Sequence, residues 1–583
     1  MKKIISVILA VSILLSLFVP IIAFAAENDE YTIYITEKQM KKKAGKYIDD
    51  ALWEAHERAT KKKPVTVVIP SGKYTLEKTL HIYSNTILKL QSDTVLVRSA
   101  DISNMLKAGR AEEVNSGYNG YVNIVVNGGV WDGNFSSDSC GMRFAHCKNV
   151  TLKNLTIKNI KNSHHMELAA SKDFTIVNCT FTGYKRNGAG DGEAIQIDPL
   201  HNTEHFPSYM YYDDTPCKNI TVKGCYFNDL YAGVGTRSGV VGSYFENIRI
   251  VDNIFDNIAD KAICGFNYRN SAIKNNMINS ATLGIILEYF PSYNVTAKMF
   301  NPNDSSADKT IIQDTNTVIS GNSINITKKT FRVNTGGILV YGAVNTKKMS
   351  KENHFPVGRY VPTGLRIKNN EIITNSALSR GIYFDRADEC KIYNNRIVCK
   401  AEAGEDINGI RLINSSRNVM RNNIIKGYYN GVYLEAKSAE NVFRANTLKS
   451  NSQYGIRIDK KASGIIYADN VFRKNTQGAI RIRKRVFKML TAAPEIESEN
   501  SKEGIGLKWN EYKDTSGYNI YRSKRKNKGY RLLTTVIGGE NTTFRDSDVK
   551  AKRRYYYKAE PFITFRNTVI FAPKSISTTK KAL

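Results

Sequence analysis

A short fragment built around Asn recurs along this chain and sets the strongest limit on its fold. Copies such as VDNIF, KNNMI, YNNRI and RANTL align with one another, and most neighbouring copies lie 23 to 28 residues apart, although three intervals are 46 to 48. A period of this size, with short β-like runs and no intervening helices, predicts stacked coils that are each too small to bury their own apolar face. We interpret each double-length interval as one coil with an inserted loop. The aligned positions are Asn154, Cys179, Cys225, Asn253, Asn276, Asn322, Asn370, Asn395, Asn423, Asn446 and Asn470.

Two features of each expected coil follow from this repeat. Asn tolerates the left-handed backbone of a tight bend, and its side-chain amide can hydrogen-bond to the same amide one coil away. A second pattern, Gly-Ile-x-Ile/Leu, recurs in GIILE (284–288), GIYFD (381–385), GIRLI (409–413) and GIRID (455–459), and these runs are the strands expected after each bend. The sequence therefore predicts parallel strands in every coil, with the Asn residues in a column on one bend.

This repeat resembles the right-handed parallel β-helix proteins of the pectin lyase-like superfamily, over roughly residues 31–490. The run DDALWEAHERATKKK (49–63) predicts a helix that caps the open end of the stack, and strand-like runs follow over 65–90. The expected organisation is an N-terminal segment with the capping helix (27–64) and an all-β right-handed parallel β-helix of about eleven to twelve coils (65–490). The superfamily contains lyases, hydrolases, epimerases and non-catalytic tailspikes or adhesins, so the resemblance implies the fold and leaves the activity open.

The first 26 residues have the pattern of a secretory signal peptide. Two lysines precede an apolar run from Ile4 to about Ala26, which ends in the small-residue sequence Ala23-Phe24-Ala25 typical of a cleavage site. An uncleaved membrane anchor is the alternative, and Pro20 together with the small residues favours cleavage. We therefore expect a secreted, extracellular protein with no membrane attachment once residues 1–26 are removed.

The charge of the chain indicates an anionic partner. Lys and Arg outnumber Asp and Glu by 84 to 54, which gives a net charge of +30. Outside the cell, such a charge favours an acidic polysaccharide or a cell-wall polymer. Nucleic acid is not an expected partner of a secreted chain, and part of the charge is a solvated surface.

The chain changes character near Thr491. Runs such as IGLKWNEY, GYNIYRS and RRYYYKAEPF alternate between turn signals, and the segment contains no Cys. Residues 491–583 resemble a fibronectin type III domain, so we expect a small β-sandwich with Trp509 and Tyr521 in its core. A spacer is the simplest role for this domain, and binding to a glycan or a cell wall is the alternative.

Metal and cysteine chemistry receives little support from the sequence. The eight Cys form no CxxC pair, which argues against a zinc site, and two of them replace Asn on adjacent coils, where buried thiols or a disulfide would fit. Glu193, Asp191, Asp213 and Asp214 are expected on loops, where their oxygens could bind calcium, although no EF-hand-like spacing supports it. No other cofactor is expected.

The stretch GDGEAIQIDPLHN (190–202) places acids, an amide and a His around one expected strand. When apolar pairs are aligned, GMRFA (141–145), HMELA (165–169), AIQID (194–198) and GVGTR (233–237) become successive rungs of one sheet, about 4.8 Å apart, so equivalent outward side chains are neighbours. One outward column then contains Arg143, Glu167 and Gln196, and the next contains Asp198 and Arg237.

Two adjacent histidines precede the second of these rungs, and neighbouring strand residues point to opposite faces. The register assigns His165, and not His164, to the outward face beside Glu167. The insertion after the third rung carries several Tyr, on which sugar rings could stack, so this face is a candidate glycan cleft. The predicted catalytic residues are Glu167, Asp198, Arg237 and His165, and the predicted substrate-binding residues are Arg143, Gln196, Glu193, His201, Tyr211, Tyr212 and Tyr268.

Two kinds of bond cleavage fit these residues. β-Elimination from a uronate chain needs a cation to neutralise the carboxylate and a base to remove the neighbouring proton, and Arg237 and His165 suit these tasks. Inverting hydrolysis needs two carboxylates about 6.5 to 9.5 Å apart, a separation expected for Glu167 and Asp198. We expect an enzyme that cleaves an acidic, uronate-containing glycan, with the lyase preferred because Arg and His accompany the acids.

Resemblance to particular enzymes does not separate the alternatives. GDGEAIQID is the nearest counterpart of polygalacturonase motifs, whose Asp-Asp and Gly-His-Gly elements are missing, and IDPLHN resembles the Asp-Pro-His-Glu of alginate epimerases except at Leu200. An inverting hydrolase of polygalacturonase type, a uronate epimerase and a non-catalytic glycan-binding or surface adhesion protein all stay open. A solvated face is a further alternative, in which Asp198 and Arg237 form a structural ion pair.

Overall fold

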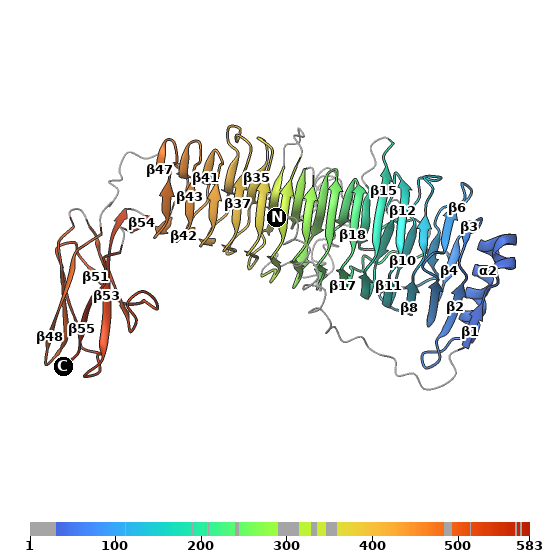
Figure 1. Cartoon of the computed structure of the whole chain (residues 1–583), viewed down its shortest axis with the longest axis horizontal. Helices are drawn as coiled ribbons and strands as arrows, with labels where there is room; N and C mark the ends of the chain where they lie inside the picture. The colour runs from blue at the N-terminus through green and yellow to red at the C-terminus, as the bar shows by residue number, and fades with distance from the viewer. Residues whose placement is uncertain are drawn as a thin grey trace, which may run out of the picture.

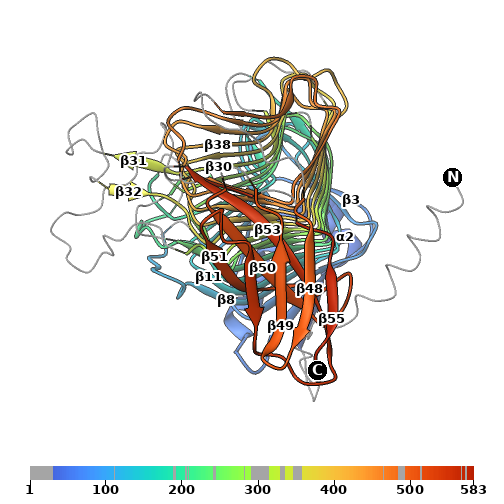
Figure 2. The ribbon, with the colours of Figure 1, turned by 90° about the vertical axis from the view of Figure 1, so that its left-hand side faces the viewer.

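The computed structural model of the chain consists of a long stack of parallel β-strands followed by a small all-β domain (Figure 1). Viewed along the stack, the strands of successive coils superimpose on one another (Figure 2). The fold is therefore all-β, a right-handed parallel β-helix followed by a small β-sandwich, as the sequence predicts. The structure describes residues 31–110, 112–187, 192–203, 206–207, 209–239, 244–280, 282–289, 314–327, 335–345, 358–463, 465–482, 493–512, 515–565, 568–571 and 574–583.

Three sheets, which we call sheets A, B and C, form the sides of the β-helix. Sheet C has 14 strands: β4 (Leu80–Ile82), β7 (Leu106–Ala108), β10 (Met142–Ala145), β13 (Met166–Ala169), β16 (Glu193–Asp198), β19 (Ala232–Gly235), β23 (Lys261–Phe266), β27 (Leu283–Glu288), β30 (Gly336–Tyr341), β35 (Arg380–Asp385), β38 (Asn408–Ile413), β41 (Asn430–Glu435), β44 (Tyr454–Ile458) and β47 (Gly478–Ile482). Sheet B also has 14: β3 (Lys73–Leu76), β6 (Val95–Arg98), β9 (Val130–Asp132), β12 (Thr156–Lys161), β15 (Thr180–Lys185), β18 (Tyr226–Leu230), β22 (Ile254–Ile258), β26 (Met277–Ser280), β29 (Ser323–Ile326), β34 (Glu371–Thr374), β37 (Arg396–Cys399), β40 (Ile424–Lys426), β43 (Thr447–Lys449) and β46 (Val471–Arg473).

Sheet A begins with the N-terminal strand and follows the whole stack. Its strands within the β-helix are β1 (Tyr31–Tyr34), β2 (Val65–Ile69), β5 (Thr86–Leu90), β8 (Tyr121–Asn127), β11 (Cys147–Lys153), β14 (Lys172–Val177), β17 (Lys218–Lys223), β20 (Phe245–Glu246), β21 (Arg249–Val251), β24 (Tyr268–Arg269), β25 (Ala272–Lys274), β28 (Val318–Ser320), β33 (Arg366–Lys368), β36 (Lys391–Tyr393), β39 (Val419–Arg421), β42 (Val442–Arg444) and β45 (Ile466–Ala468). One inserted hairpin lies outside the three sheets and consists of β31 (Ala343–Asn345) and β32 (Gly358–Tyr360).

A ladder of buried Asn side chains runs along one bend of the stack, as the sequence predicts. Each Asn donates a hydrogen bond from Nδ2 to Oδ1 of the next Asn, at 2.9 to 3.0 Å, from Asn253 to Asn470. The double-length intervals are single coils with insertions, because β15 pairs with β18 and β29 with both β26 and β34. These bonds satisfy amides that would be costly to bury without partners.

The left-handed bend is made by the residue before each ladder position and not by the ladder Asn. Asn369 and Asn394 have φ of 55° and 57°, and each precedes a ladder Asn. The alignment was wrong by one residue at Asn154, which has φ of 56°, while Leu155 occupies the ladder position beside Cys179. At these bends the first Asn adopts the left-handed backbone conformation, and the Asn that follows it makes the buried hydrogen bonds of the ladder.

The stack has more coils than the eleven to twelve predicted, since sheets B and C each contain 14 strands. The additional coils are at the N-terminal end, where rungs such as β3 and β6 carry no ladder Asn and therefore give no signal to the alignment. The capping helix α2 (Glu37–Arg58) begins earlier and ends earlier than predicted. Thr36 starts it with a capping box to Gln39, and the buried face includes Ile48 and Leu52.

Two sheets form the C-terminal domain. One contains β48 (Ile496–Ser501), β49 (Gly504–Trp509) and β52 (Thr543–Asp546), and the other contains β50 (Gly517–Ser523), β51 (Arg531–Ile537), β53 (Arg554–Phe565), β54 (Thr568–Phe571) and β55 (Thr578–Lys581). Trp509 and Tyr518 lie in the core between them. Tyr521 is buried against Glu560 and Lys574 instead. Strand β54 pairs with β45, so the domain continues sheet A of the β-helix.

The termini of the chain and its cysteines bear on the remaining expectations. The predicted signal peptide lies outside the described residues. Within the described parts of the chain, no helix is long and apolar enough to span a bilayer. All eight cysteines fall in described segments and are buried free thiols, so Cys179 and Cys225 form no disulfide.

Candidate functional site

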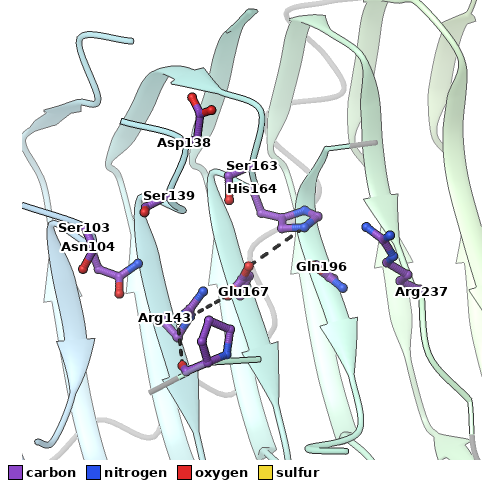
Figure 3. Close-up of a pocket in the computed structure, with 11 residues that line it drawn as sticks. Ser103, Asn104, Asp138, Ser139, Arg143, Ser163, His164, Glu167, Gln196 and Arg237 are labelled. Atoms are coloured by element: carbon purple, nitrogen blue, oxygen red, sulfur yellow. Dashed lines mark hydrogen bonds and ion pairs between the residues drawn. The ribbon is translucent and has the colours of Figure 1, made fainter. Parts of the chain in front are cut away.

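A polar pocket opens on the outer face of sheet C, over the rungs that the alignment singles out (Figure 3). The register is the one predicted, since Arg143 pairs with Glu167, and Glu167 with Gln196. The cavity has a volume of about 310 Å³. It is lined by Ser103, Asn104, Asp138, Ser139, Arg143, Ser163, His164, Glu167, Gln196, Pro207 and Arg237.

An ion pair forms the floor of this pocket. Nε of Arg143 lies 2.5 Å from Oε2 of Glu167, and both side chains are buried. The guanidinium also donates to the carbonyl oxygen of Pro207 at 2.8 Å and lies over the ring of Phe206, 5.1 Å from its centroid. The insertion after β16 thus folds back over the column and fixes the orientation of the Glu167 carboxylate.

The prediction of His165 as a pocket residue was wrong, and His164 takes that place. His165 is fully buried inside the β-helix, where Nε2 lies 3.1 Å from the carbonyl oxygen of Thr182 and burial lowers the pKa of the imidazole to about 4. His164 lines the pocket, with Nε2 at 3.9 Å from Oε1 of Glu167. Strand β13 begins at Met166, so both histidines belong to the bend, where alternation does not apply.

The tautomer of His164 follows from its second ring nitrogen. Nδ1 lies 3.0 Å from the carbonyl oxygen of Glu193, which accepts hydrogen bonds only, so Nδ1 carries the proton of a neutral ring. Nε2 therefore presents a lone pair on the pocket side of the ring. A basic nitrogen in this position can remove a proton from a bound molecule.

Asp198 and Arg237 do not form the side-chain ion pair considered above. Oδ1 of Asp198 accepts hydrogen bonds from the backbone N–H groups of Arg237 and Ser238, at 2.8 and 3.1 Å, and Nε2 of Gln196 donates to Oδ2. Burial raises the pKa of Asp198 to about 6, against the lowering effect of these donors. Asp198 does not line the pocket itself, because Gln196 lies between them.

The side chain of Arg237 is exposed at the edge of the pocket, beyond Gln196 in Figure 3. No ion pair joins its guanidinium to a carboxylate in the described parts of the chain. Oε1 of Gln196 is also buried without a hydrogen-bond partner among described residues. The pocket therefore holds an unpaired cation and an unused acceptor side by side.

Glu193 was predicted on a loop, and it lies instead at the start of β16, buried. Its carboxylate is 3.2 Å from Nζ of Lys261 and 3.6 Å from Nδ1 of His164. Burial opposes ionisation of Glu193, but Lys261 and His164 outweigh it, and the pKa is lower than usual. Glu193 thus supports His164 from behind the pocket.

The remaining predicted residues lie outside the pocket, and one was placed wrongly. Tyr268 is fully buried in the core of the β-helix, and burial raises its pKa, so it is not accessible to a glycan. His201 is buried in the insertion, with Nδ1 at 2.6 Å from Oδ1 of Asp214. Tyr211 is exposed, and Tyr212 is half-buried, donating to the carbonyl oxygen of Phe206 at 3.0 Å. None of these residues lines the pocket.

Some pocket residues were missed, and calcium gains no support. Asp138 and Asn104 come from the bends before β10 and β7, where no periodic signal marks them. Asp191, one of the predicted calcium ligands, lies outside the described residues. Over the described ranges, no three His, Cys, Asp or Glu side chains are grouped so that they could hold a metal ion.

Comparison with known proteins supports the fold. A family model described as "Right handed beta helix region" matches residues 317–485. Plasmin and fibronectin-binding protein A of Streptococcus pneumoniae (strain ATCC BAA-255 / R6) is 24% identical over 259 residues, which are 38% of this chain and 36% of that protein. The chain thus spans about a third of the length of this relative.

Solved structures include both an adhesin and an enzyme. The S. pneumoniae surface protein and adhesin PfbA aligns with 75% of this chain and 96% of its own, at 18% identity and a TM-score of 0.49. A hyperthermoactive exopolygalacturonase from Thermotoga maritima aligns with 71% of this chain and 92% of its own, at 11% identity and a TM-score of 0.36. The matched family model and the three long sheets together establish a right-handed parallel β-helix.

Proposed function

We propose that this protein is an extracellular polysaccharide lyase that binds an acidic, uronate-containing glycan in the sheet C pocket. The observation that carries the proposal is that two groups line the same pocket. One is the guanidinium of Arg237, which has no carboxylate partner among the described residues, and the other is the imidazole of His164, whose Nε2 lies on the pocket side. A cation without a partner suits a carboxylate of the ligand, and a neutral imidazole suits proton removal. The predicted signal peptide and the net charge of +30 are consistent with an acidic polymer outside the cell.

The reaction follows from these two groups. The uronate carboxylate pairs with Arg237, which stabilises negative charge as it develops on the neighbouring carbon. Nε2 of His164 removes the proton from that carbon, and the electron pair forms a carbon–carbon double bond as the glycosidic C–O bond breaks. The departing oxygen takes a proton from water or from the imidazolium. Glu167, held by Arg143, stabilises the charged imidazole.

Hydrolysis is the second candidate, favoured by one observation. Glu167 pairs with Arg143, and Asp198 has a pKa near 6. The two carboxyl groups thus lie in different environments, as an acid and a base require. The position of Gln196 between Asp198 and the pocket weighs against this candidate, since a general acid must reach the glycosidic oxygen.

Binding without turnover is the third candidate, suggested by the name of the S. pneumoniae relative. A surface protein that holds a glycan or a host protein would use the same pocket, with Arg237 as an anchor. In either case we propose that residues 491–583 are a domain of fibronectin type III character that acts as a spacer, because β54 attaches it to the end of the stack.

The test is a screen of polygalacturonate, alginate and hyaluronate with the secreted protein. Ultraviolet absorbance of an unsaturated uronate and the release of reducing ends are recorded together. A lyase yields both signals, a hydrolase yields reducing ends alone, and binding in the pocket without either signal supports the third candidate. Arg237→Gln should abolish turnover, whereas Arg481→Gln, an exposed Arg at the far end of the same sheet, is the matched control.

A further inference from the structure

The positive charge of the β-helix is concentrated on one of its three sides. From β11 to β45, the strands of sheet A carry 13 Lys and Arg and two acids, Asp173 and Glu246. From β10 to β47, the strands of sheet C carry six of each kind. The cations of sheet A are Lys148, Lys153, Lys172, Lys218, Lys223, Arg249, Arg269, Lys274, Arg366, Lys368, Lys391, Arg421 and Arg444. A face that was merely solvated would mix both signs, as sheet C does.

One outward column of sheet A, which we call the cation row, repeats a cation at every second rung. It consists of Lys153, Lys223, Lys274, Lys368 and Arg421, in register through the intervening rungs. The residues between them are Val177, Val251, Ser320 and Tyr393. Two rungs span about 10 Å, so the row presents evenly spaced charges along the axis of the stack.

The cation row has no carboxylate partners in the described parts of the chain. The ion pairs of these sheet A strands join Lys218 to Glu246 and Arg444 to Asp469. Lys218 lies outside the cation row, and Arg444 follows Arg421 in the same column, one rung beyond the end of the row. Among the described aromatic rings, Tyr393 alone approaches the row, with Lys368 and Arg421 at 5.9 and 5.1 Å from the ring centroid. Like charges on adjacent rungs repel, and a spacing near one Debye length keeps the repulsion tolerable in salt.

We infer that the outer face of sheet A binds a linear polyanionic glycopolymer that lies along the stack, on a different side from the pocket. Strands β8, β11, β17 and β42 of this sheet follow the lower edge of the stack in Figure 1. An extended polymer with regularly spaced carboxylates or phosphates matches a regular row of cations, whereas a small anion would need convergent groups. Single-stranded nucleic acid needs several stacking aromatics, and the row offers Tyr393 alone.

This inference does not depend on cleavage in the pocket. The experiment measures binding of fluorescent polygalacturonate and of poly(glycerol phosphate) to the full chain as a function of salt. The variant carries Lys153→Gln, Lys223→Gln, Lys274→Gln and Lys368→Gln. The control loses an equal number of charges, but from sheet B, through Lys185→Gln, Lys426→Gln, Lys449→Gln and Arg473→Gln.

The sheet A variant should bind at least about tenfold more weakly to one of the two polymers, with a flatter dependence of affinity on salt, because fewer counterions are released. The sheet B control should stay within about twofold. Weaker binding of polygalacturonate alone would identify carboxylates as the groups bound by the row, and weaker binding of poly(glycerol phosphate) alone would identify phosphates. Equal losses in both variants, or no loss in the first, would overturn the inference.

Two further probes test the class of polymer, and one variant separates this face from the pocket. Duplex DNA or phosphatidylglycerol vesicles that bind more tightly than either glycopolymer, through the same four lysines, would show that the partner is not a glycan. Arg237→Gln should leave polymer binding to sheet A within about twofold while it abolishes turnover. Failure of the pocket and failure of the cation row are thus separate results.

Discussion

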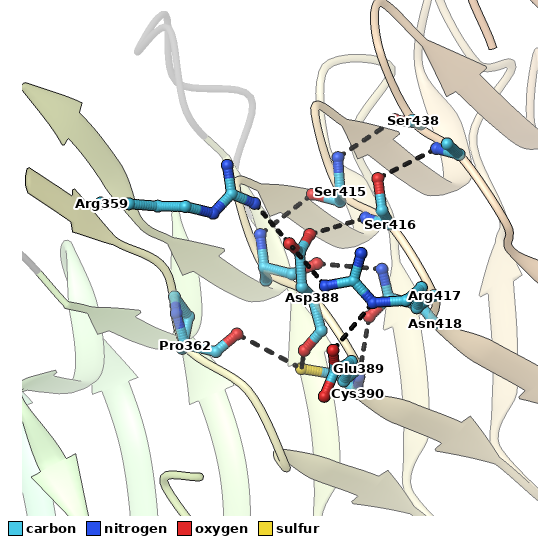
Figure 4. Close-up of polar contacts among 12 residues, drawn as sticks. Arg359, Pro362, Asp388, Glu389, Cys390, Ser415, Ser416, Arg417, Asn418 and Ser438 are labelled. Atoms are coloured by element: carbon cyan, nitrogen blue, oxygen red, sulfur yellow. Dashed lines mark hydrogen bonds and ion pairs between the residues drawn. The ribbon is translucent and has the colours of Figure 1, made fainter. Parts of the chain in front are cut away.

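Two buried aspartates, each next to or within a bend of the same β-helix, differ in what surrounds them. Asp388 accepts a hydrogen bond from the backbone N–H of Ser416 at 2.7 Å and contacts the guanidinium groups of Arg359 and Arg417 (Figure 4). Asp198 accepts from two backbone N–H groups and from Gln196, and no cation of the described chain contacts it. Both are 2% exposed. A buried carboxyl with cations is part of the framework, whereas one with neutral donors alone holds its proton more readily.

The largest expected effect separates the two bends by activity. His164→Gln or Arg237→Gln should lower turnover of the polysaccharide found in the screen about 100-fold or more, the scale for loss of a base or of charge stabilisation. Asp388→Asn should leave turnover within about twofold, since its side chain is far along the stack from the pocket rungs. Initial rates at saturating substrate measure both. Similar losses at the two bends would mean that the comparison reflects folding and not function.

The second effect concerns pH, and its sign differs between two buried groups. Asp198 has a folded-state pKa raised from 3.8 to about 6, so its stabilising contribution is complete below pH 4 and is lost as the pH rises through 6. His165 has a folded-state pKa lowered from 6.5 to about 4, so its contribution is complete above pH 6.5 and is lost as the pH falls through 4. Each shift corresponds to about 3 kcal/mol, and between pH 4 and 6 the two oppose each other.

Single substitutions should separate the two opposing pH dependences of the free energy of unfolding. Asp198→Asn removes the contribution of Asp198, so as the pH is lowered from 6 to 4 the free energy of unfolding should fall by about 3 kcal/mol relative to the wild-type protein. His165→Gln removes the contribution of His165, and as the pH is raised from 4 to 6.5 the free energy of unfolding should fall by a similar amount relative to the wild-type protein. Denaturant unfolding at a series of pH values measures both. Unchanged slopes in both variants would show that neither shift exists in solution.

A smaller loss of stability is expected at the other bend. Asp388→Ala removes the acceptor for the Ser416 N–H and the partner of two guanidinium groups, which should cost about 1–3 kcal/mol. The cost stays moderate because the side chains of Arg359 and Arg417 are about half exposed and can turn to water. Chemical denaturation measures it, with Glu389→Ala as the control. Glu389 pairs with Arg417 at the exposed surface and should cost less than about 1 kcal/mol.

The same contrast shows why some features could be predicted from the sequence and others could not. Arg143, Glu167 and Gln196 lie on regular strands, where apolar residues that must face the core fix the register and hence the outward column. The histidines precede β13, so alternation assigned the wrong one to the pocket. Tyr268 follows Asn267, whose φ of 48° turns the chain before β24, and alternation carried over from β23 fails there.

The electrostatic character of the site could not be predicted from the sequence, for a related reason. Asp198 and Arg237 were correctly placed near each other, but which atoms meet depends on the backbone after β19, which ends at Gly235. The bend turns the N–H of Arg237 to the carboxylate and leaves its guanidinium at the pocket edge. Spacing along a repeat predicts strands well, and the bends between strands hold most of the chemistry.

The smallest expected effect lies at the end farthest from the pocket. Each coil contacts only its neighbours, so a chain ending at Ala493 should lose stability in the last coils alone, with the main thermal midpoint shifted by less than about 2 °C and turnover unchanged. The C-terminal domain does touch the stack, since β54 pairs with β45 and Lys574 lies 3.5 Å from Asp469. Truncation also exposes the edge of β45, which invites aggregation. Val569→Pro in the full chain removes a ladder hydrogen bond without exposing that edge fully and is the matched control. Differential scanning calorimetry of both proteins decides the matter: a main transition that broadens or vanishes in both would show that the sandwich is part of the cooperative core of the β-helix, including the rungs that hold the pocket.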